Sequence, residues 1–153
     1  MMRTRFPLAV VVALSALTAL GCRRDEVPPA DSAVAAPAPA PAMVTTIETG
    51  KHIDASKRIV DTASVFAPND TMYVSVVTSN ATASTTLKTV VTFQTGQVVD
   101  SSTQAVAAPT TAGGTSVTEF HLVKPGGWPT GDYTVEVWLD GQSAGTRTLT
   151  VRR

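Results

Sequence analysis

The chain has 153 residues, of which 43% are hydrophobic, and its 12 Lys and Arg side chains balance 12 Asp and Glu side chains. This balance, without a basic stripe that could hold phosphates, argues against a nucleic-acid partner. The single Cys excludes an intramolecular disulfide framework.

The N-terminal segment has the three-part layout of an export signal. Arg3 and Arg5 supply a short positive region, and residues 6–20 then run without a charge and are dominated by Ala, Val and Leu. The apolar run is too short for a comfortable membrane span, and small residues close it. We therefore predict a cleavable signal-peptide helix at residues 1–21.

The next residue is a cysteine in a distinctive setting. The run Ala19-Leu20-Gly21-Cys22 resembles the bacterial lipobox, at which a diacylglyceryl group is joined to the Cys thiol before the signal is cut. It departs from the commonest form, which has Leu in place of Ala19 and a small residue in place of Leu20. The resemblance implies lipidation at Cys22 and a membrane as partner. Two or more acyl chains would anchor the protein stably.

The rarity of cysteine supports this interpretation. Cys22 is the only Cys in the chain, and an unpaired Cys in an exported protein needs an explanation that acylation provides. The alternative is an ordinary signal peptide that is cut nearby, with Cys22 incidental. An Asp after the Cys would resemble the signal for retention in the inner membrane. Arg23 stands there instead, which favours the outer membrane, at its periplasmic face or surface.

A segment rich in Ala and Pro follows the lipobox and completes the linker at residues 22–42. Alternating Pro removes backbone donors and fixes φ, so neither helix nor sheet can form. Such a disordered but extended tether is typical of a spacer. The alternative is a docking peptide for a Pro-binding module, although no charged or aromatic anchor interrupts the Ala-Pro run.

Residues 43–153 form one predicted domain, long enough to bury a core without disulfides. Thr, Val and Ser dominate, and hydrophobic side chains recur with period two rather than 3.6. The region between 104 and 114 is expected to be a long connection between two sheets. Asp140-Gly141 predicts a type I′ hairpin turn. We expect strands at 44–49, 58–66, 71–78, 87–93, 97–103, 115–123, 133–139 and 142–151, of which 58–66 is the weakest.

Alternation also predicts which side chains enter the core. On the strand at 133–139, Tyr133, Val135 and Val137 face inward together with Leu139. The Tyr133 hydroxyl is expected to reach a backbone group near the end of the domain. Other inward residues are predicted to be Met72, Val74, Val76, Leu87, Thr89, Val91, Phe93, Phe120, Leu122, Leu149 and Val151.

The C-terminal hairpin resembles that of bacterial extracytoplasmic immunoglobulin-like modules. Many of these end in Gly-x-Tyr-x-Val-x-Val, matched here by Gly131, Tyr133, Val135 and Val137. The turn Gly-Trp-Pro-x-Gly at 127–131 recurs in uncharacterised bacterial proteins of this kind. The resemblance implies an all-β, antiparallel immunoglobulin-like sandwich of about seven strands, without the Cys-Trp-Cys core of antibody domains. It says nothing specific about function.

Candidate metal ligands are few. His52 with Asp54 could offer two ligands, and His121 with Glu119 another two, whereas metal sites usually need three or four. We expect solvated polar residues at both places, and neither a metal nor another cofactor.

Catalytic constellations are also missing from the sequence. Asp132 and Glu136 face the same way on one strand but are expected to face water rather than a substrate. Gly113-Gly114 is too short for a phosphate loop. The sequence therefore predicts a protein that is not an enzyme, with no small-molecule substrate evident.

Possible partner-binding residues are Trp128, Trp138 and Lys124. A Trp mounted between Gly and Pro is a rigid aromatic of the kind enriched in binding hot spots. The alternative, favoured here, is that the Trp128 ring plugs the open end of the sandwich. Trp138 is predicted to point outward and to share an exposed sheet face with Lys88, Val90 or Val77.

Two functions follow from these observations. The first is a membrane-anchored, non-enzymatic binding or structural module that meets a protein or another component of the cell envelope. The alternative is a small inhibitor of exported proteases that acts through the loop Lys124–Asp132, with Trp128 at its tip.

Overall fold

The computed structural model describes residues 38–153, which form strands, turns and loops and contain no helix. The predicted signal peptide, Cys22 and most of the predicted tether lie outside these residues. Within the described part no helix is long and apolar enough to cross a membrane. Residues 37–153 make up a compact unit of their own, so the sandwich is a self-contained body.

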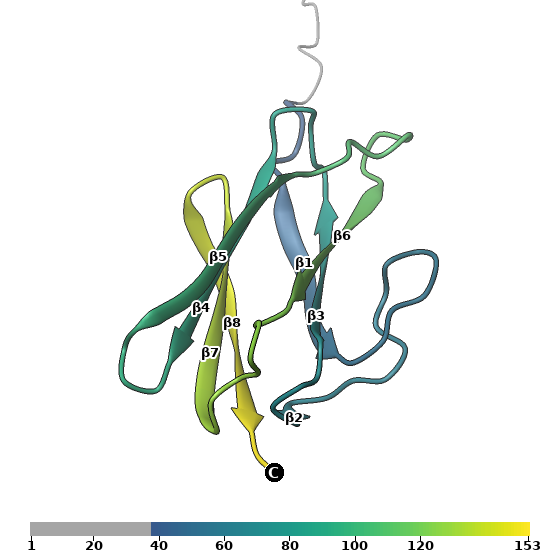
Figure 1. The fold of residues 1–153 in the computed structure, drawn as a ribbon. Coiled ribbons are helices and arrows are strands. Elements are labelled where there is room, and N and C mark those ends of the chain that lie inside the picture. The colour runs from purple at the N-terminus through teal and green to yellow at the C-terminus, as the bar shows by residue number, and fades with distance from the viewer. Residues whose placement is uncertain (1–37) are drawn as a thin grey trace, which may run out of the picture. The chain divides into compact units, whose positions relative to one another are not determined.

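Eight strands build two sheets (Figure 1). One sheet has three strands in the order β1-β3-β6, and the other has five in the order β2-β8-β7-β4-β5. Neighbours are antiparallel except β2 and β8, which are parallel. The strands are β1 (Met43–Gly50), β2 (Val65–Phe66), β3 (Met72–Ser79), β4 (Thr86–Phe93), β5 (Val98–Ala105), β6 (Thr115–Leu122), β7 (Gly131–Leu139) and β8 (Gln142–Val151). The prediction of an all-β sandwich is confirmed.

The core forms where the inner faces of the two sheets meet, as alternation requires. Leu87, Val91, Val135 and Val137 are completely buried on β4 and β7 of the five-stranded sheet. The predicted inward residues are buried, except that Phe93 and Leu139 are only partly covered and pack at the rim of the core. From the three-stranded sheet the core receives Ile47, Met72, Val74, Val76, Phe120 and Leu122. The predicted facing is therefore correct for most of the domain.

The segment 58–66 departs from the prediction, because only Val65–Phe66 forms a strand. Residues before it make an irregular loop, in which Ile53 and Ile59 pair by a single bridge. Lys57, directly before this segment, has a positive φ of 65° and closes a turn with Asp54. The apolar residues of this segment are therefore distributed along a loop instead of one face of a strand.

The predicted hairpin and crossover are both present. Asp140 and Gly141 have φ of 47° and 81°, as a type I′ turn requires at its two central positions. A bulge in β8 follows, where Gly145 lies opposite Val137 while Ser143 lies opposite Trp138. The connection after β5 leads from one sheet to the other, as expected for residues 104–114.

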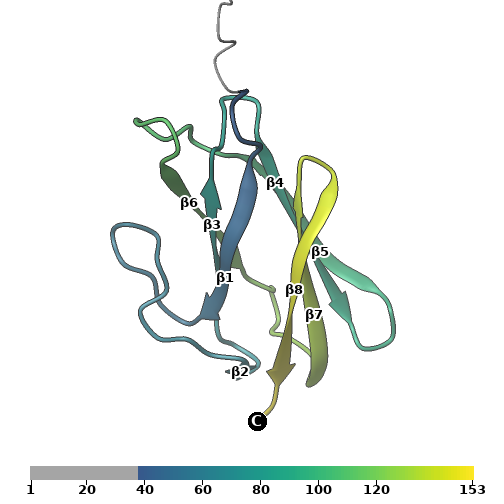
Figure 2. The same ribbon diagram turned by 180° about the vertical axis from the view of Figure 1, so that it is seen from behind.

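β1 starts at the end of the sandwich that holds the β7–β8 turn, and β8 finishes at the opposite end (Figure 2). Next to its start, Met43 and Val44 line a shallow depression together with Leu139 and Asp140. Before β1, the Pro41 carbonyl accepts a hydrogen bond of 3.3 Å from Asn80 Nδ2. The point at which the tether joins the domain is therefore beside the β7–β8 turn.

Candidate functional site

Trp138 lies on the outer face of the five-stranded sheet, as predicted. It is half-buried on β7, directly opposite Lys88 of β4 and Ser143 of β8. Its neighbours along β7, Val137 and Leu139, face the other way, since successive side chains of a strand alternate. The sheet thus holds Trp138 on a rigid support rather than on a loop.

A groove of about 400 Å³ runs beside Trp138. Its volume lies within the range of small-ligand sites, about 300–1,000 Å³. Polar side chains from three strands surround the indole and one aliphatic residue. The lining consists of Thr86, Lys88, Val90, Thr103, Glu136, Trp138 and Gly141.

Some polar groups of the groove already make hydrogen bonds within the domain, and others do not. Glu136 Oε1 accepts a hydrogen bond of 2.8 Å from Ser143 Oγ, and the Thr86 N–H donates to Asp140 Oδ1 at 2.7 Å. Lys88 is exposed and makes no ion pair within the described residues. The Trp138 N–H is buried and meets no acceptor. Trp138 therefore offers a ring surface, while the hydrogen-bonding capacity belongs to the residues around it.

Of the residues predicted to share this face with Trp138, the structure brings together Lys88 and Val90 but not Val77. Val77 belongs to β3 in the three-stranded sheet and is only 5% exposed. On the same face of β3, the loop after β1 folds back onto Ser75, whose Oγ donates to the Lys57 carbonyl. The prediction that Val77 joins the exposed patch is wrong.

The sequence argument did not single out Thr86 and Thr103. Alternation places Thr86 on the same side of β4 as Lys88 and Val90, so that residue had a signal in the sequence. Thr103 lies opposite Lys88 only through the register of β4 and β5, which is shifted by a bulge near Val91. Register between strands is a long-range property, and the local pattern of β5 did not contain it.

Trp128 has the opposite environment, and its prediction as a partner-binding residue is corrected. Its ring is 3% exposed and belongs to the core, with its centroid 5.6 Å from that of Tyr133 in an edge-to-face arrangement. The Trp128 N–H of the backbone donates to the Pro68 carbonyl at 2.7 Å, which ties the loop to the turn before β3. Lys124 places its ammonium 5.9 Å from the indole centroid. The plug interpretation is the one that the structure matches.

Tyr133 fixes this plug. Its ring is 1% exposed, and its hydroxyl donates to the Pro129 carbonyl at 2.7 Å, as predicted for a backbone group at the domain end. Burial raises the pKa of the Tyr133 hydroxyl above its ordinary value. In the tyrosine corner of immunoglobulin-like domains, a Tyr near the start of a strand bonds through its hydroxyl to a backbone group a few residues upstream. Tyr133 and Pro129 have this arrangement.

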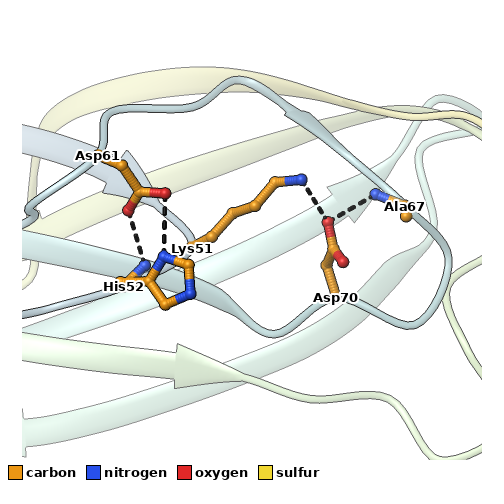
Figure 3. A network of polar contacts seen from close by, with 5 residues as sticks. All are labelled: Lys51, His52, Asp61, Ala67 and Asp70. Carbon is orange, nitrogen blue, oxygen red and sulfur yellow. Dashed lines mark hydrogen bonds and ion pairs between the residues drawn. The ribbon is translucent and has the colours of Figure 1, made fainter.

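A polar network joins the loop that follows β1 to the turn between β2 and β3 (Figure 3). His52 donates its backbone N–H to Asp61 Oδ1 at 2.9 Å, and His52 Nδ1 lies 3.0 Å from Asp61 Oδ2. Lys51 Nζ lies 2.7 Å from Asp70 Oδ2, which also accepts from the Ala67 N–H at 2.8 Å. The His52 side chain lowers the pKa of Asp61, and the Lys51 ammonium lowers that of Asp70. These contacts brace the loop.

His52 and Asp54, the first candidate pair of metal ligands, do not contact each other in the structure. Asp54 Oδ1 instead accepts from the N–H groups of Arg58 and Ser56, and these bonds lower its pKa. The Asp54 carboxylate closes its own turn, which is a common local preference of Asp. Asp61, the actual partner, lies nine residues away and gave no local signal.

His121 and Glu119, the second candidate pair of metal ligands, do lie near each other. His121 Nδ1 lies 3.8 Å from Glu119 Oε2 on β6, as expected for residues two apart on one strand face. Glu119 Oε2 is buried without a hydrogen bond, and the Glu119 carbonyl accepts from Gln104 Nε2 at 2.9 Å. Across residues 38–153 no three His, Cys, Asp or Glu side chains gather closely enough to hold a metal ion.

The two carboxylates of β7 are separated by their partners. Asp132 Oδ1 accepts from Thr150 Oγ1 at 2.7 Å, whereas Glu136 bonds Ser143. Both face outward, as predicted, but they share no contact and no cleft. They therefore do not form an acid–base pair with a common substrate position.

No protein-family model matches the chain, and neither does any curated protein. Among solved structures, an immunoglobulin-like protein from Pseudomonas aeruginosa is similar with a TM-score of 0.52 and 16% identity, over 75% of this chain and 99% of that one. The C-terminal domain of Wzt has a TM-score of 0.52 and 11% identity, over 73% and 74%. The alkylpurine DNA glycosylase AlkC from Pseudomonas fluorescens, bound to DNA with an abasic site analog, has a TM-score of 0.50 and 12% identity, and this chain spans only 32% of its length. At such identities the similarity shows the fold alone, which is an immunoglobulin-like β-sandwich.

Proposed function

We propose that the protein is an exported, lipid-anchored and non-enzymatic module that binds a component of the cell envelope through the outer face of its five-stranded sheet. The export and anchoring parts rest on the signal-like N-terminus and the lipobox-like run that ends at Cys22. The Ala-Pro tether would hold the sandwich away from the membrane that carries the lipid.

The non-enzymatic part rests on what surrounds the polar groups of the sandwich. The carboxylates of Asp132 and Glu136 are engaged separately by Thr150 and Ser143. The fold resembles an immunoglobulin-like protein over nearly the whole of that protein's length. Both points support a domain that presents a surface rather than one that performs chemistry.

The observation that carries the binding part is the groove beside Trp138. A large aromatic stands half-exposed on the outer sheet face, next to the hydroxyls of Thr86 and Thr103 and to Lys88, which makes no ion pair within residues 38–153. Exposed aromatics on rigid supports are typical of interaction sites. The loop Lys124–Asp132 offers no comparable feature, because its Trp128 is in the core. A protease-inhibiting wedge at that loop therefore lacks its tip.

Lipidation is tested in cells that produce the full chain or its Cys22→Ser variant. We expect the full chain to incorporate labelled palmitate and to fractionate with membranes, because the acyl chains hold it there. Cys22→Ser should lose both the label and the membrane association. An unlabelled wild type that stays in the membrane fraction regardless of Cys22 would contradict the anchor.

Binding is tested with the soluble body at residues 37–153 and sedimented envelopes from the same cells. Wild type should pellet with the envelopes in a saturable manner. Trp138→Ala should pellet less, whereas Val60→Ala, in the exposed loop between β1 and β2 and outside this sheet face, should behave as wild type. If wild type fails to pellet, or all three pellet equally, this face is not the binding surface.

A further inference from the structure

We infer that the groove beside Trp138 is a binding site for a glycan chain, with the indole as the platform for one sugar ring. This inference rests on the proposed function and names the chemistry of its envelope component. The argument uses the composition of the sheet face, its hydrogen-bonding capacity and its charge.

The indole supplies the apolar part of the site. The Trp138 N–H is buried without an acceptor, so a ligand in the groove meets the ring and not its donor. An aromatic ring carries negative charge density on its face. One side of a pyranose exposes a patch of weakly positive C–H bonds, which fits such a face. The Val90 side chain extends the apolar floor on the neighbouring strand.

Hydroxyl groups surround this platform in regular rows. A hydroxyl can donate one hydrogen bond and accept two, which matches a ligand whose own groups are hydroxyls. The Thr86 and Thr150 hydroxyls already donate to Asp140 and Asp132, so toward a ligand these two act as acceptors. On the outer side the register pairs Lys88 with Thr103, Val90 with Ser101, and Glu136 with Thr146. The rows continue along the sheet with Thr92, Thr134, Thr148 and Thr150.

The charges of the groove are few and balanced. Lys88 supplies one ammonium and Glu136 one carboxylate, which is already bonded to Ser143. Such a lining does not select a strongly anionic or cationic ligand. It supplies a cationic donor and a hydrogen-bonded carboxylate at the edge of an aromatic floor, which suits a neutral polyhydroxylated ligand.

The same composition argues against a protein as the occupant. The centres of protein interfaces are enriched in aromatic residues, Met and Arg, and are depleted of Lys and Ser. Around Trp138 the only aliphatic residue of the groove is Val90, and Thr is the commonest residue type. The outer face of the sheet continues on both sides of the groove through the outward residues of β4, β7 and β8, so it has room for an extended chain.

The test measures binding of the 37–153 body to envelopes after two separate treatments. Periodate cleaves the vicinal diols of sugars, and proteinase K digests proteins. We expect periodate to abolish sedimentation with the envelopes and proteinase K to leave it intact. Loss after proteinase K with full binding after periodate would overturn the glycan while the proposed function stands. If the protein does not bind untreated envelopes, both the glycan site and the proposed binding function are contradicted.

Purified ligands then identify the source of the sugar chain. The arms are isolated cell-wall sacculi, delipidated lipopolysaccharide polysaccharide and the neutral glucan dextran. Binding to any arm supports a glycan site, provided that Trp138→Ala weakens it about tenfold or more, as expected for the loss of a ring contact of about 1.5 kcal/mol. Lys88→Met, which keeps the stem and removes the ammonium, should weaken it less. Equal binding by wild type and Trp138→Ala, or binding to no arm, would overturn the inference.

Discussion

The two tryptophans of this domain lie ten residues apart in the sequence and have opposite environments. Trp128 is 3% exposed at the end of the sandwich and packs against Tyr133. Trp138 is half-buried on an open sheet face, opposite Lys88. Both indole N–H groups lack an acceptor, so the difference is in the rings: one completes the core and the other borders a groove.

What separates them is the kind of backbone that carries each residue. Trp128 follows Gly126 and Gly127, with φ of 83° and 86°, and this turn folds the ring beneath the loop. Trp138 is in a regular strand, where alternation alone turns it outward. A loop can turn a large side chain toward the core by bending, whereas in a strand alternation sets the facing, which buries Tyr133 and turns Trp138 outward on the same strand.

The largest effect is expected for Tyr133→Ala, which removes the ring that supports Trp128. The ring also contacts Phe93, with centroids 5.0 Å apart. Its loss leaves a cavity inside the sandwich and should lower the free energy of unfolding by about 3–5 kcal/mol, as for Phe→Ala. Urea melts of the 37–153 body measure it. A loss below that of Trp138→Ala would mean that the facing of β7 is inverted.

Trp128→Ala should lower the free energy of unfolding by about 3 kcal/mol, at the lower end of the range for buried aromatics. The plug is at the end of the sandwich, so water can enter part of the space that it vacates. Chemical denaturation with fluorescence of Trp138 as the signal measures the change. An effect comparable to that of an exposed residue, below about 0.5 kcal/mol, would contradict the plug.

The facing of most strands could be predicted because a two-residue period is a local property. Leu87, Val91, Val135 and Val137 needed only their own strand to be placed in the core. The turn at Asp140-Gly141 was equally local, because both positions demand positive φ.

The groove beside Trp138 and the course of the loop after β1 could not be predicted from local periodicity. Val77 and Trp138 both looked outward by alternation, but the assignment of β3 and β7 to different sheets is a property of the whole topology. Likewise Asp61 pairs with His52 across an irregular loop whose course depends on many contacts. Long-range register and loop geometry are what the sequence pattern leaves undetermined.

Trp138→Ala should lower the free energy of unfolding by about 1.5 kcal/mol or less, because its ring is partly solvated in the folded state. The same urea melts used for Trp128→Ala provide the comparison. If Trp138→Ala were the more damaging of the two, the open face would be a second core face, and the proposed binding surface would fall with it.

Tyr133→Phe keeps the ring and removes only its hydrogen bond to the Pro129 carbonyl. We expect a loss of about 1 kcal/mol, the net contribution of one hydrogen bond. Trp128 fluorescence in the Trp138→Phe background should keep a buried emission maximum, because the ring contact survives. A loss as large as that of Tyr133→Ala would show that the hydroxyl, and not the ring, holds the plug.

The smallest effect concerns the turn under the plug, where Asp70 bonds Lys51 and the Ala67 N–H. Pro68 in this turn accepts the backbone bond of Trp128. Lys51 holds the pKa of Asp70 below its ordinary value, so the folded state favours the carboxylate. The contribution of the Asp70 carboxylate to the free energy of unfolding is fully present above the ordinary Asp pKa and disappears as the pH falls through the lower pKa of the folded state.

Asp70→Asn should therefore be less stable than wild type at pH 7, by about 1 kcal/mol or less for a surface ion pair. At a pH below that lower pKa the two proteins should converge, because the wild-type carboxyl is then neutral as well. Asp54 and Asp61 also have lowered pKa values, but they are common to both proteins and cancel in the difference. Urea melts of both proteins across this pH range measure the difference, and a gap that stays constant with pH would show that the Asp70 charge contributes nothing to the turn.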